Sequence, residues 1–164
     1  MLEWIAQVLS AAVGTAAFAL LFSVPPNCYL RCGVIGGLGW LCYLALDRLG
    51  LGTIVSIFAA TALVVFCSRY SAVRRRCPVT LFLIPGIFPL VPGAGIYWTA
   101  YYVVTDQIDL AAQKGFSTLK AAVAIVLGIL LIFARASFGP WRSGKKNRKS
   151  VWTKCPHSFF FVFH

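Results

Sequence analysis

Prolines crowd one apolar stretch of this chain, and their spacing gives the stretch the chemistry of a binding site. Pro85, Pro89 and Pro92 stand within eight residues, and each lacks the backbone N–H that a continuous helix requires. A helix through all three would release the carbonyl oxygens of Leu81, Pro85 and Phe88. Such free carbonyls can coordinate a cation or an ammonium group when they line a cavity in a membrane protein.

A helix that restarts after the prolines would supply the complementary half of a zwitterion site. Glycines at 86, 93 and 95 allow backbone conformations that other residues avoid. The first turn of a helix near 93–96 would present free N–H groups and a partial positive charge to an anion. A tyrosine within the next turn would need a partner for its buried hydroxyl. The predicted substrate-binding residues are Pro85, Gly86, Pro89, Pro92, Gly93, Gly95 and Tyr97.

A plainer interpretation of the same prolines stays open. Proline-kinked helices occur often in membrane proteins, where neighbouring helices supply the missing hydrogen bonds. One kink needs one proline and this stretch has three. We therefore keep both interpretations, a substrate site and a kinked structural helix.

The composition identifies the kind of element that must position this stretch. Of the 164 residues, 60% are hydrophobic and 12% are charged, whereas a soluble domain carries about 25% charged residues. The chain cannot cover a globular surface with its polar groups, so it is an integral membrane protein. Its net charge of +11 comes in short clusters between apolar segments, which is typical of cytoplasmic loops and not of a nucleic-acid interface.

The apolar segments predict an all-α fold of five transmembrane helices. They are expected at 2–22, 28–46, 49–68, 77–105 and 115–134, with the fourth discontinuous around 85–93 because of its Pro/Gly-rich linker. Five crossings place twelve of the fifteen basic residues on one side and all four acids on the other. The positive-inside rule then puts the N-terminus outside and the C-terminus in the cytoplasm. Residues 1–138 form the five-helix module, and 139–164 form a basic, Phe-ended cytoplasmic tail.

Glycines in the second segment indicate helix packing. The segment offers no preceding strand for a dinucleotide loop, but a Gly-x-x-x-Gly face lets two membrane helices approach closely. The first helix has a matching surface of small residues at 11–17. The predicted packing residues are Gly33, Gly36, Gly37, Gly39 and Trp40.

Arrangements typical of catalysis or of metal binding are missing from the sequence. Neither paired acids within a span nor a phosphate-binding loop is found. The six cysteines form no Cys-x-x-Cys pair and the only histidines are His157 and His164, which does not suit a four-ligand zinc site. We expect no enzyme activity, no metal and no cofactor.

Four features together resemble the membrane module of the threonine/serine exporter family over about residues 5–136. They are "FSVPPN", "GVIGGLGW", "RRRCPVTLFLIPGIFPLVPGAGIY" and the acid at Asp106. The resemblance implies efflux of small amino acids or related carboxylated metabolites, driven by the proton motive force, across the cytoplasmic (inner) membrane. Some members of the family join this module to a second one, and others pair a short chain with a separate multi-span subunit. The tail at 139–164 has no counterpart in that pattern.

The sequence leaves three functions as candidates. The chain is expected to be an exporter subunit that contacts membrane lipid, a small-molecule substrate and a second multi-span subunit, without nucleic acid. It is alternatively a non-transporting scaffold or assembly subunit, in which the glycine faces matter and the broken helix is incidental. A third possibility is an exporter of small dicarboxylates.

Overall fold

The computed structural model describes residues 2–75 and 77–138, and every regular element in these two ranges is a helix. The α-helices are α1 (Leu2–Leu21), α2 (Tyr29–Arg48), α3 (Thr53–Arg75), α4 (Thr80–Ile87), α5 (Gly93–Val104) and α6 (Ile108–Phe138). Two 3-10 helices, η1 (Pro26–Cys28) and η2 (Phe88–Leu90), lie before α2 and after α4. The predicted tail at 139–164 falls outside the described residues.

Four of these helices, α1, α2, α3 and α6, are long and apolar enough to cross a membrane. The pair formed by α4–η2 and α5 makes a fifth crossing when it is taken as one span, and it is bent by 49° at its break. The predicted all-α membrane architecture is therefore confirmed, with four spans or, when the bent pair counts as one span, the predicted five.

Two of the helices end in the same hydrogen-bonded motif. After α1, Ser23 takes a positive φ of 52° and its N–H donates to Leu20 O, while Val24 N–H donates to Ala19 O. This is a Schellman motif, which satisfies the last carbonyls of a helix. Asp106, with a φ of 58°, ends α5 in the same way, and Asp is one of the few residues that tolerate this conformation. The acid at 106 thus has a structural reason to stand where it does.

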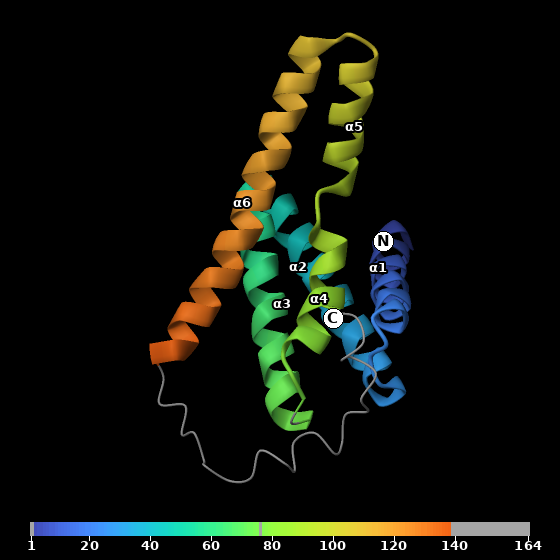
Figure 1. The fold of residues 1–164 in the computed structure, drawn as a ribbon, viewed down its shortest axis with the longest axis vertical. Coiled ribbons are helices and arrows are strands. Elements are labelled where there is room, and N and C mark those ends of the chain that lie inside the picture. Colours follow the sequence, from blue (N-terminus) through green and yellow to red (C-terminus); the bar gives the residue numbers. More distant parts are fainter. Residues whose placement is uncertain (1, 76, 139–164) are drawn as a thin grey trace, which may run out of the picture.

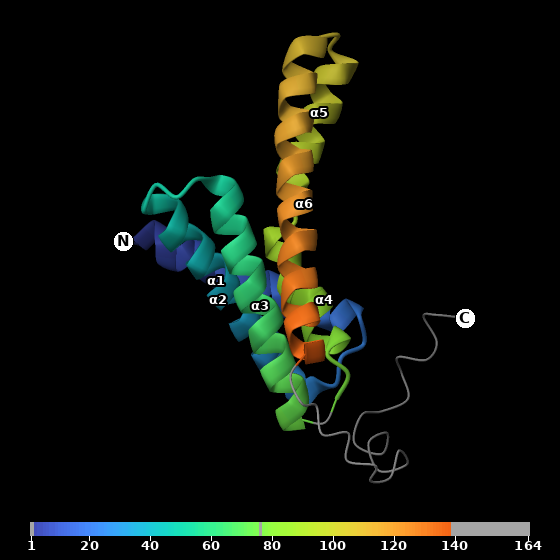
Figure 2. The ribbon, with the colours of Figure 1, turned by 90° about the vertical axis from the view of Figure 1, so that its left-hand side faces the viewer.

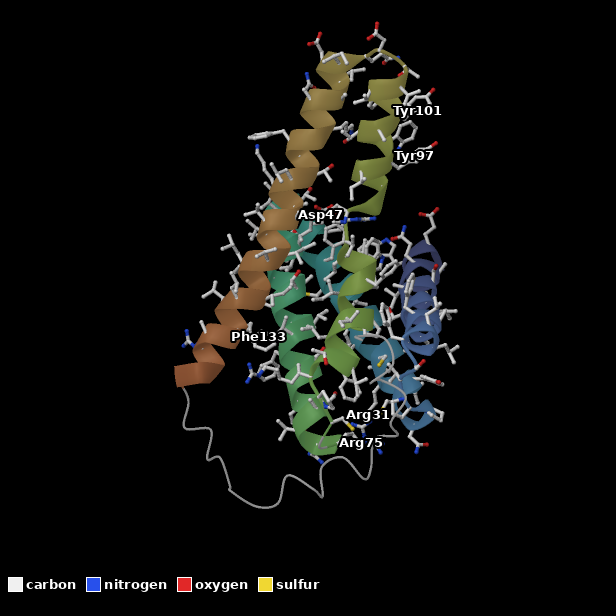
Figure 3. The ribbon with its side chains drawn as sticks, viewed as in Figure 1. Arg31, Asp47, Arg75, Tyr97, Tyr101 and Phe133 are labelled. Atoms are coloured by element: carbon white, nitrogen blue, oxygen red, sulfur yellow. The ribbon has the colours of Figure 1, made fainter. Side chains whose placement is uncertain are left out.

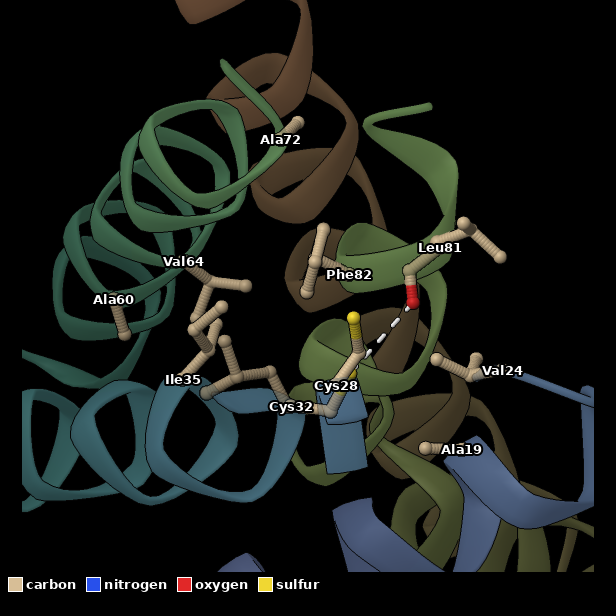
Figure 4. Packing of buried hydrophobic residues seen from close by; sticks show 11 residues of the cluster. Ala19, Val24, Cys28, Cys32, Ile35, Ala60, Val64, Ala72, Leu81 and Phe82 are labelled. Atoms are coloured by element: carbon tan, nitrogen blue, oxygen red, sulfur yellow. Dashed lines mark hydrogen bonds between the residues drawn. The ribbon is translucent and has the colours of Figure 1, made fainter. Parts of the chain in front are cut away.

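The first four α-helices form the packed body of the protein. α1, α2 and α3 pack in sequence, and α4–η2 lies against all three. The main core lies where α4 meets α2 and α3, as Figure 4 shows from close by. Its buried members are Ala19, Val24, Cys28, Cys32, Ile35, Ala60, Val64, Ala72, Leu81, Phe82 and Leu90.

Helices α5 and α6 form a hairpin that extends past this body (Figures 1 and 2). The lower half of α6 packs along α3, and its upper half packs along α5. With 31 residues, α6 is about 46 Å long at 1.5 Å per residue. None of the α5 residues is buried, so most of the surface of α5 is uncovered within this chain.

Both α3 and α6 run past their predicted limits, 49–68 and 115–134. The positive φ of Gly50, 76°, delays the start of α3, while beyond residue 68 the helix continues through arginines. The Arg69 guanidinium lies 5.0 Å from the centre of the Phe133 ring, a cation–π contact that keeps a charged side chain on the helix surface. The apolar pattern of the sequence predicts only the part of a helix that lies in lipid, and α3 and α6 both extend beyond that part.

Charged side chains separate along the long axis of the molecule. Arg31 and Arg75 lie together at one end, and Asp47 lies well away from them toward the other (Figure 3). The start of α1 lies beside the end of α2, since the Arg48 guanidinium stacks 4.2 Å from the centre of the Trp4 ring. Arg31 and Arg75 therefore lie at a different level of the molecule from Asp47, whose end of α2 also carries Arg48.

Candidate substrate site at the broken span

The interruption in the fourth span is narrower than the discontinuity predicted around residues 85–93. Pro85 lies inside α4 and Pro89 lies inside η2, both on a helical path. That path stops at Val91 (ψ 127°) and Pro92 (φ −76°, ψ 56°), where Gly93 N–H donates to Val91 O over 2.7 Å. These are the angles and the hydrogen bond of an inverse γ-turn. The break is therefore a tight turn centred on Pro92.

Each of the three carbonyls that the prolines release has a hydrogen-bond donor. The thiol of Cys32 on α2 donates to Leu81 O over 3.8 Å, the dashed line in Figure 4. The N–H of Phe88 donates to Pro85 O, and the N–H of Val91 donates to Phe88 O. One neighbouring helix and two 3-10 bonds thus satisfy these acceptors. This arrangement is what the kinked-helix interpretation requires, and it leaves a carbonyl-lined cation site without direct support.

At the break, the backbone N–H groups at the start of α5 are better placed to bind a ligand than the carbonyl groups that the prolines release. Pro92 caps α5 without a side-chain hydrogen bond, and Ile96 N–H is the first that donates to Pro92 O. The N–H groups of Ala94 and Gly95 precede that bond, so they have no acceptor within the helix. A Cβ atom at Gly93 would meet nothing within 4 Å. This open first turn carries a partial positive charge and suits an anionic group.

Pro85 and Gly86 lie away from that turn, buried in the core. A Cβ atom at Gly86 would stand 3.1 Å from Ile35 Cγ2 and 3.2 Å from Val64 Cγ1. Gly86 therefore allows α4 to approach α2 and α3 closely. Pro85, next to it, is among the most completely buried side chains of the protein.

Tyr97 lies on the outer surface of α5. Its side chain is 63% exposed, and in Figure 3 it points away from α6, as does Tyr101 one turn further on. The Tyr97 ring contacts those of Trp98 and Tyr101, with centroids 5.6 and 6.5 Å apart. Within this chain Tyr97 is therefore separated from Pro85 and Gly86.

The glycine cluster of α2 lies at helix contacts. A Cβ atom at Gly33 would stand 3.1 Å from Ala12 O, and one at Gly37 would stand 3.3 Å from Ala12 Cβ. Both contacts are with α1. Gly39 faces the opposite way, because a Cβ atom there would come within 2.5 Å of Val64 on α3. The cluster thus lets α2 pack closely on two neighbours at once.

Threonines oppose glycines at three of the helix contacts, a feature that the sequence alone does not reveal. Each threonine hydroxyl donates to the carbonyl four residues earlier in its own helix, over 2.7–2.8 Å. The hydroxyl is thereby satisfied, and the side chain fills the space that the glycine of the facing helix leaves. The pairs are Thr15 with Gly36, Thr61 with Gly128, Thr99 with Gly115 and Thr118 with Gly95. Gly95, predicted as a substrate residue, therefore also packs α5 on α6.

The sequence also could not predict which group donates a hydrogen bond to Leu81 O. Proline spacing identifies the acceptor, but Cys32 stands 49 residues away. The described residues contain no group of three or more His, Cys, Asp and Glu side chains that could hold a metal ion. His157 and His164 lie outside that part of the chain.

These features define a multi-pass helical membrane protein with one bent and interrupted helix pair, and secondary transporters use such interrupted helices around their substrate sites. Residues 7–134 match the family described as "Threonine/Serine exporter, ThrE", and this chain belongs to that family. Membership supports a transporter of the threonine/serine exporter type.

An uncharacterized protein of Haemophilus influenzae is 28% identical to the chain over 97 residues. The matched region is 59% of this chain and 33% of that protein, so the chain spans only about a third of that longer relative. No solved structure matches the chain.

Proposed function

We propose that this chain is a subunit of a secondary transporter that exports small amino acids of the threonine/serine type, driven by the proton motive force. The observation that carries the proposal is the family match over residues 7–134, which includes the whole broken span. A span interrupted by a tight turn at Pro92, with an uncapped helix directly after it, is consistent with a site for a small solute.

In this proposal the carboxylate of the substrate binds at the first turn of α5. The unpaired N–H groups of Ala94 and Gly95, and the open space at Gly93, support this placement. Pro85, Gly86 and Pro89 hold the α4 side of the break in position. Pro92 forms the turn, and Tyr97 contacts substrate or a partner from the outer side.

A second multi-span subunit completes the site in this proposal. α5 packs on α6 and has no buried residue, so the first turn of α5 lacks a second wall within this chain. Tyr97, Trp98 and Tyr101 on its surface are 63%, 45% and 46% exposed. A partner that resembles the other module of the exporter family would cover these rings and enclose the substrate.

Two other functions remain candidates. A non-transporting scaffold or assembly subunit is favoured by the close packing at the glycines and by the satisfied proline carbonyls. An exporter of small dicarboxylates would use the same N–H groups for one of its two carboxylates.

A flux measurement separates these functions. Membranes that contain the full chain, expressed alone and with a co-purifying multi-span protein, are loaded with labelled threonine, serine, alanine, succinate or malate. We expect efflux of threonine and serine that requires the partner and stops when a protonophore collapses the proton gradient. Efflux of the dicarboxylates alone would support the third function. Absence of efflux for all five solutes, with normal assembly of the partner, would support the scaffold.

We also propose that the N-terminus lies outside and that the basic ends of the helices face the cytoplasm of the inner membrane. The separation of Arg31 and Arg75 from Asp47 supports this orientation (Figure 3). Arg75→Cys should react with an impermeant maleimide only after the cells are opened, and Leu110→Cys should react in intact cells. Both positions are exposed. Labelling of both from the same side would contradict the five-span arrangement.

A further inference from the structure

Ser68 on α3 is a buried hydroxyl that differs from three other buried hydroxyls of the protein. The hydroxyls of Thr15, Ser56 and Thr61, all nearly or completely buried, donate to the carbonyl four residues earlier in the chain. Ser68 is 0% exposed, and its Oγ atom has no hydrogen-bond partner among the residues that the structure describes. A buried hydroxyl without a partner is costly. Since the helix offers the usual acceptor, the side chain is directed elsewhere.

The hydroxyl of Ser68 lies at the contact between α3 and the broken span. Its Oγ atom stands 3.9 Å from the position of a Cβ atom at Gly86, and the two nearer neighbours of that position are Ile35 and Val64. Gly86 follows Pro85, and the carbonyl that Pro85 releases already receives the Cys32 thiol. The nearer neighbours at this point are apolar side-chain carbons, and the Ser68 Oγ atom has no partner on α4 among the described residues.

A second buried donor without a partner stands on another helix that packs on the same segment. The indole Nε1 of Trp40 on α2 is buried, and it too has no acceptor in the described ranges. Its neighbour Gly39 approaches Leu90 of η2, with 3.9 Å to the leucine Cδ1 from a Cβ atom at Gly39. Trp40 itself packs against the same core cluster as Leu90. An indole N–H can only donate, so the missing partner of Trp40 is an acceptor.

We propose that Ser68, with Trp40, lines the route by which substrate passes beside α4–η2, between the basic ends of the helices and the first turn of α5. The inference rests on the proposed transport function and extends it to residues outside the Pro/Gly stretch. The ligand class is a small solute with a carboxylate, whose oxygens accept from the Ser68 hydroxyl and the Trp40 indole when α4 separates from α3. Ser68 remains unpaired in the packed state because its partner is present only during transport.

Efflux and stability of Ser68→Ala together test this role. Removal of an unpaired buried hydroxyl should leave the thermal midpoint in detergent unchanged or raised, while efflux of threonine falls by about fivefold to tenfold. Trp40→Phe keeps an aromatic ring without the donor and should also lower efflux. Ser56→Ala is the matched control, because Ser56 lies on the same helix, is equally buried, and donates to Gly52 O over 3.0 Å. It should export at the wild-type rate with a small loss of stability.

Chemical labelling provides an independent measurement. Ser68→Cys, in a Cys67→Ala background, should react with N-ethylmaleimide in membranes that are transporting, and threonine should protect it. Wild-type efflux from Ser68→Ala, or a thiol at 68 that never reacts, would overturn the inference while leaving the exporter function intact. A lowered thermal midpoint with normal efflux would overturn it as well, by giving Ser68 a structural role. A wild-type complex that exports none of the solutes would reject the transport function itself.

Discussion

Gly36→Ala is expected to destabilise the protein by about 2 kcal/mol, because the added methyl group meets a side chain that cannot move aside. The new Cβ atom would overlap Thr15 of α1, whose Cβ and Cγ2 atoms would be 2.8 and 2.9 Å away. Thr15 is β-branched, and its hydroxyl is held by Ala11 O over 2.7 Å. The contact must therefore be relieved by separating α1 from α2. Thermal denaturation of the purified protein in mild detergent measures the loss.

A control and a rescue variant distinguish this clash from a general intolerance of glycine substitution. Gly14→Ala adds the same methyl group to α1, where nothing lies within 4 Å, and should be neutral or slightly stabilising because Ala favours the helix. Thr15→Gly removes the side chain that the new methyl group of Gly36→Ala would meet, so the double variant should lose less stability than the sum of the two single variants. Additive losses would show that Thr15 and Gly36 are not coupled and would contradict the pairing.

The same pairing explains how the α5–α6 hairpin holds together without a buried core of its own. Thr99 and Gly115 pair in one direction across the hairpin, and Gly95 and Thr118 pair in the other. Lipid is as apolar as leucine, so membrane helices associate through close packing and not through the hydrophobic effect. Reciprocal pairs of this kind make a narrow hairpin. Because the hairpin is narrow, the residues of α5 are exposed on every side except the one that faces α6.

The four long spans could be read from the sequence, because lipid imposes a length and an apolar composition on every crossing. Helix limits could not. α3 continues to Arg75, and its Arg69 side chain packs on the ring of Phe133, which belongs to a helix far along the chain. The end of α5 depends on a positive φ at Asp106, a conformation that Asp tolerates but does not require.

The site was predictable in its chemistry only in part. Proline spacing named Leu81, Pro85 and Phe88 as the released acceptors, and each of these carbonyls takes a donor other than the α-helical N–H four residues later. The sequence could not show that those donors exist, because the Cys32 thiol reaches Leu81 only through the packing of α2 on α4. The free hydrogen-bonding groups at the break are therefore the N–H donors at the start of α5, and not the carbonyl acceptors that the prolines release. The sequence could not single out Ser68 either, because a lone serine in an apolar helix gives no sign that its hydroxyl is unpaired in the packed protein.

Replacing two prolines together, Pro89→Ala with Pro92→Ala, is expected to straighten the fourth span and to reduce threonine efflux by about tenfold or more. Alanine at 92 restores an N–H that can donate to Phe88 O, which now receives Val91 N–H. The inverse γ-turn then loses its advantage over helix, and α4, η2 and α5 can join. Helix continuity takes the N–H groups of Ala94 and Gly95 into the hydrogen-bond ladder, which removes the donors proposed for the carboxylate. Misplacement of a binding group by an ångström can cost about a hundredfold in rate.

Spin labels at the two ends of the span report the straightening independently of transport. Thr80 and Val104 are both exposed, Val104 at 85%, and a continuous helix between them would be about 36 Å long at 1.5 Å per residue. The distance should lengthen toward that value in the double variant and stay short in wild type, where the span is bent by 49°. Pro26→Ala, in the exposed η1 turn, is the matched control and should change neither distance nor efflux. A straightened span that still exports threonine at the wild-type rate would show that the break is not the substrate site, and the scaffold function would then account better for the three prolines.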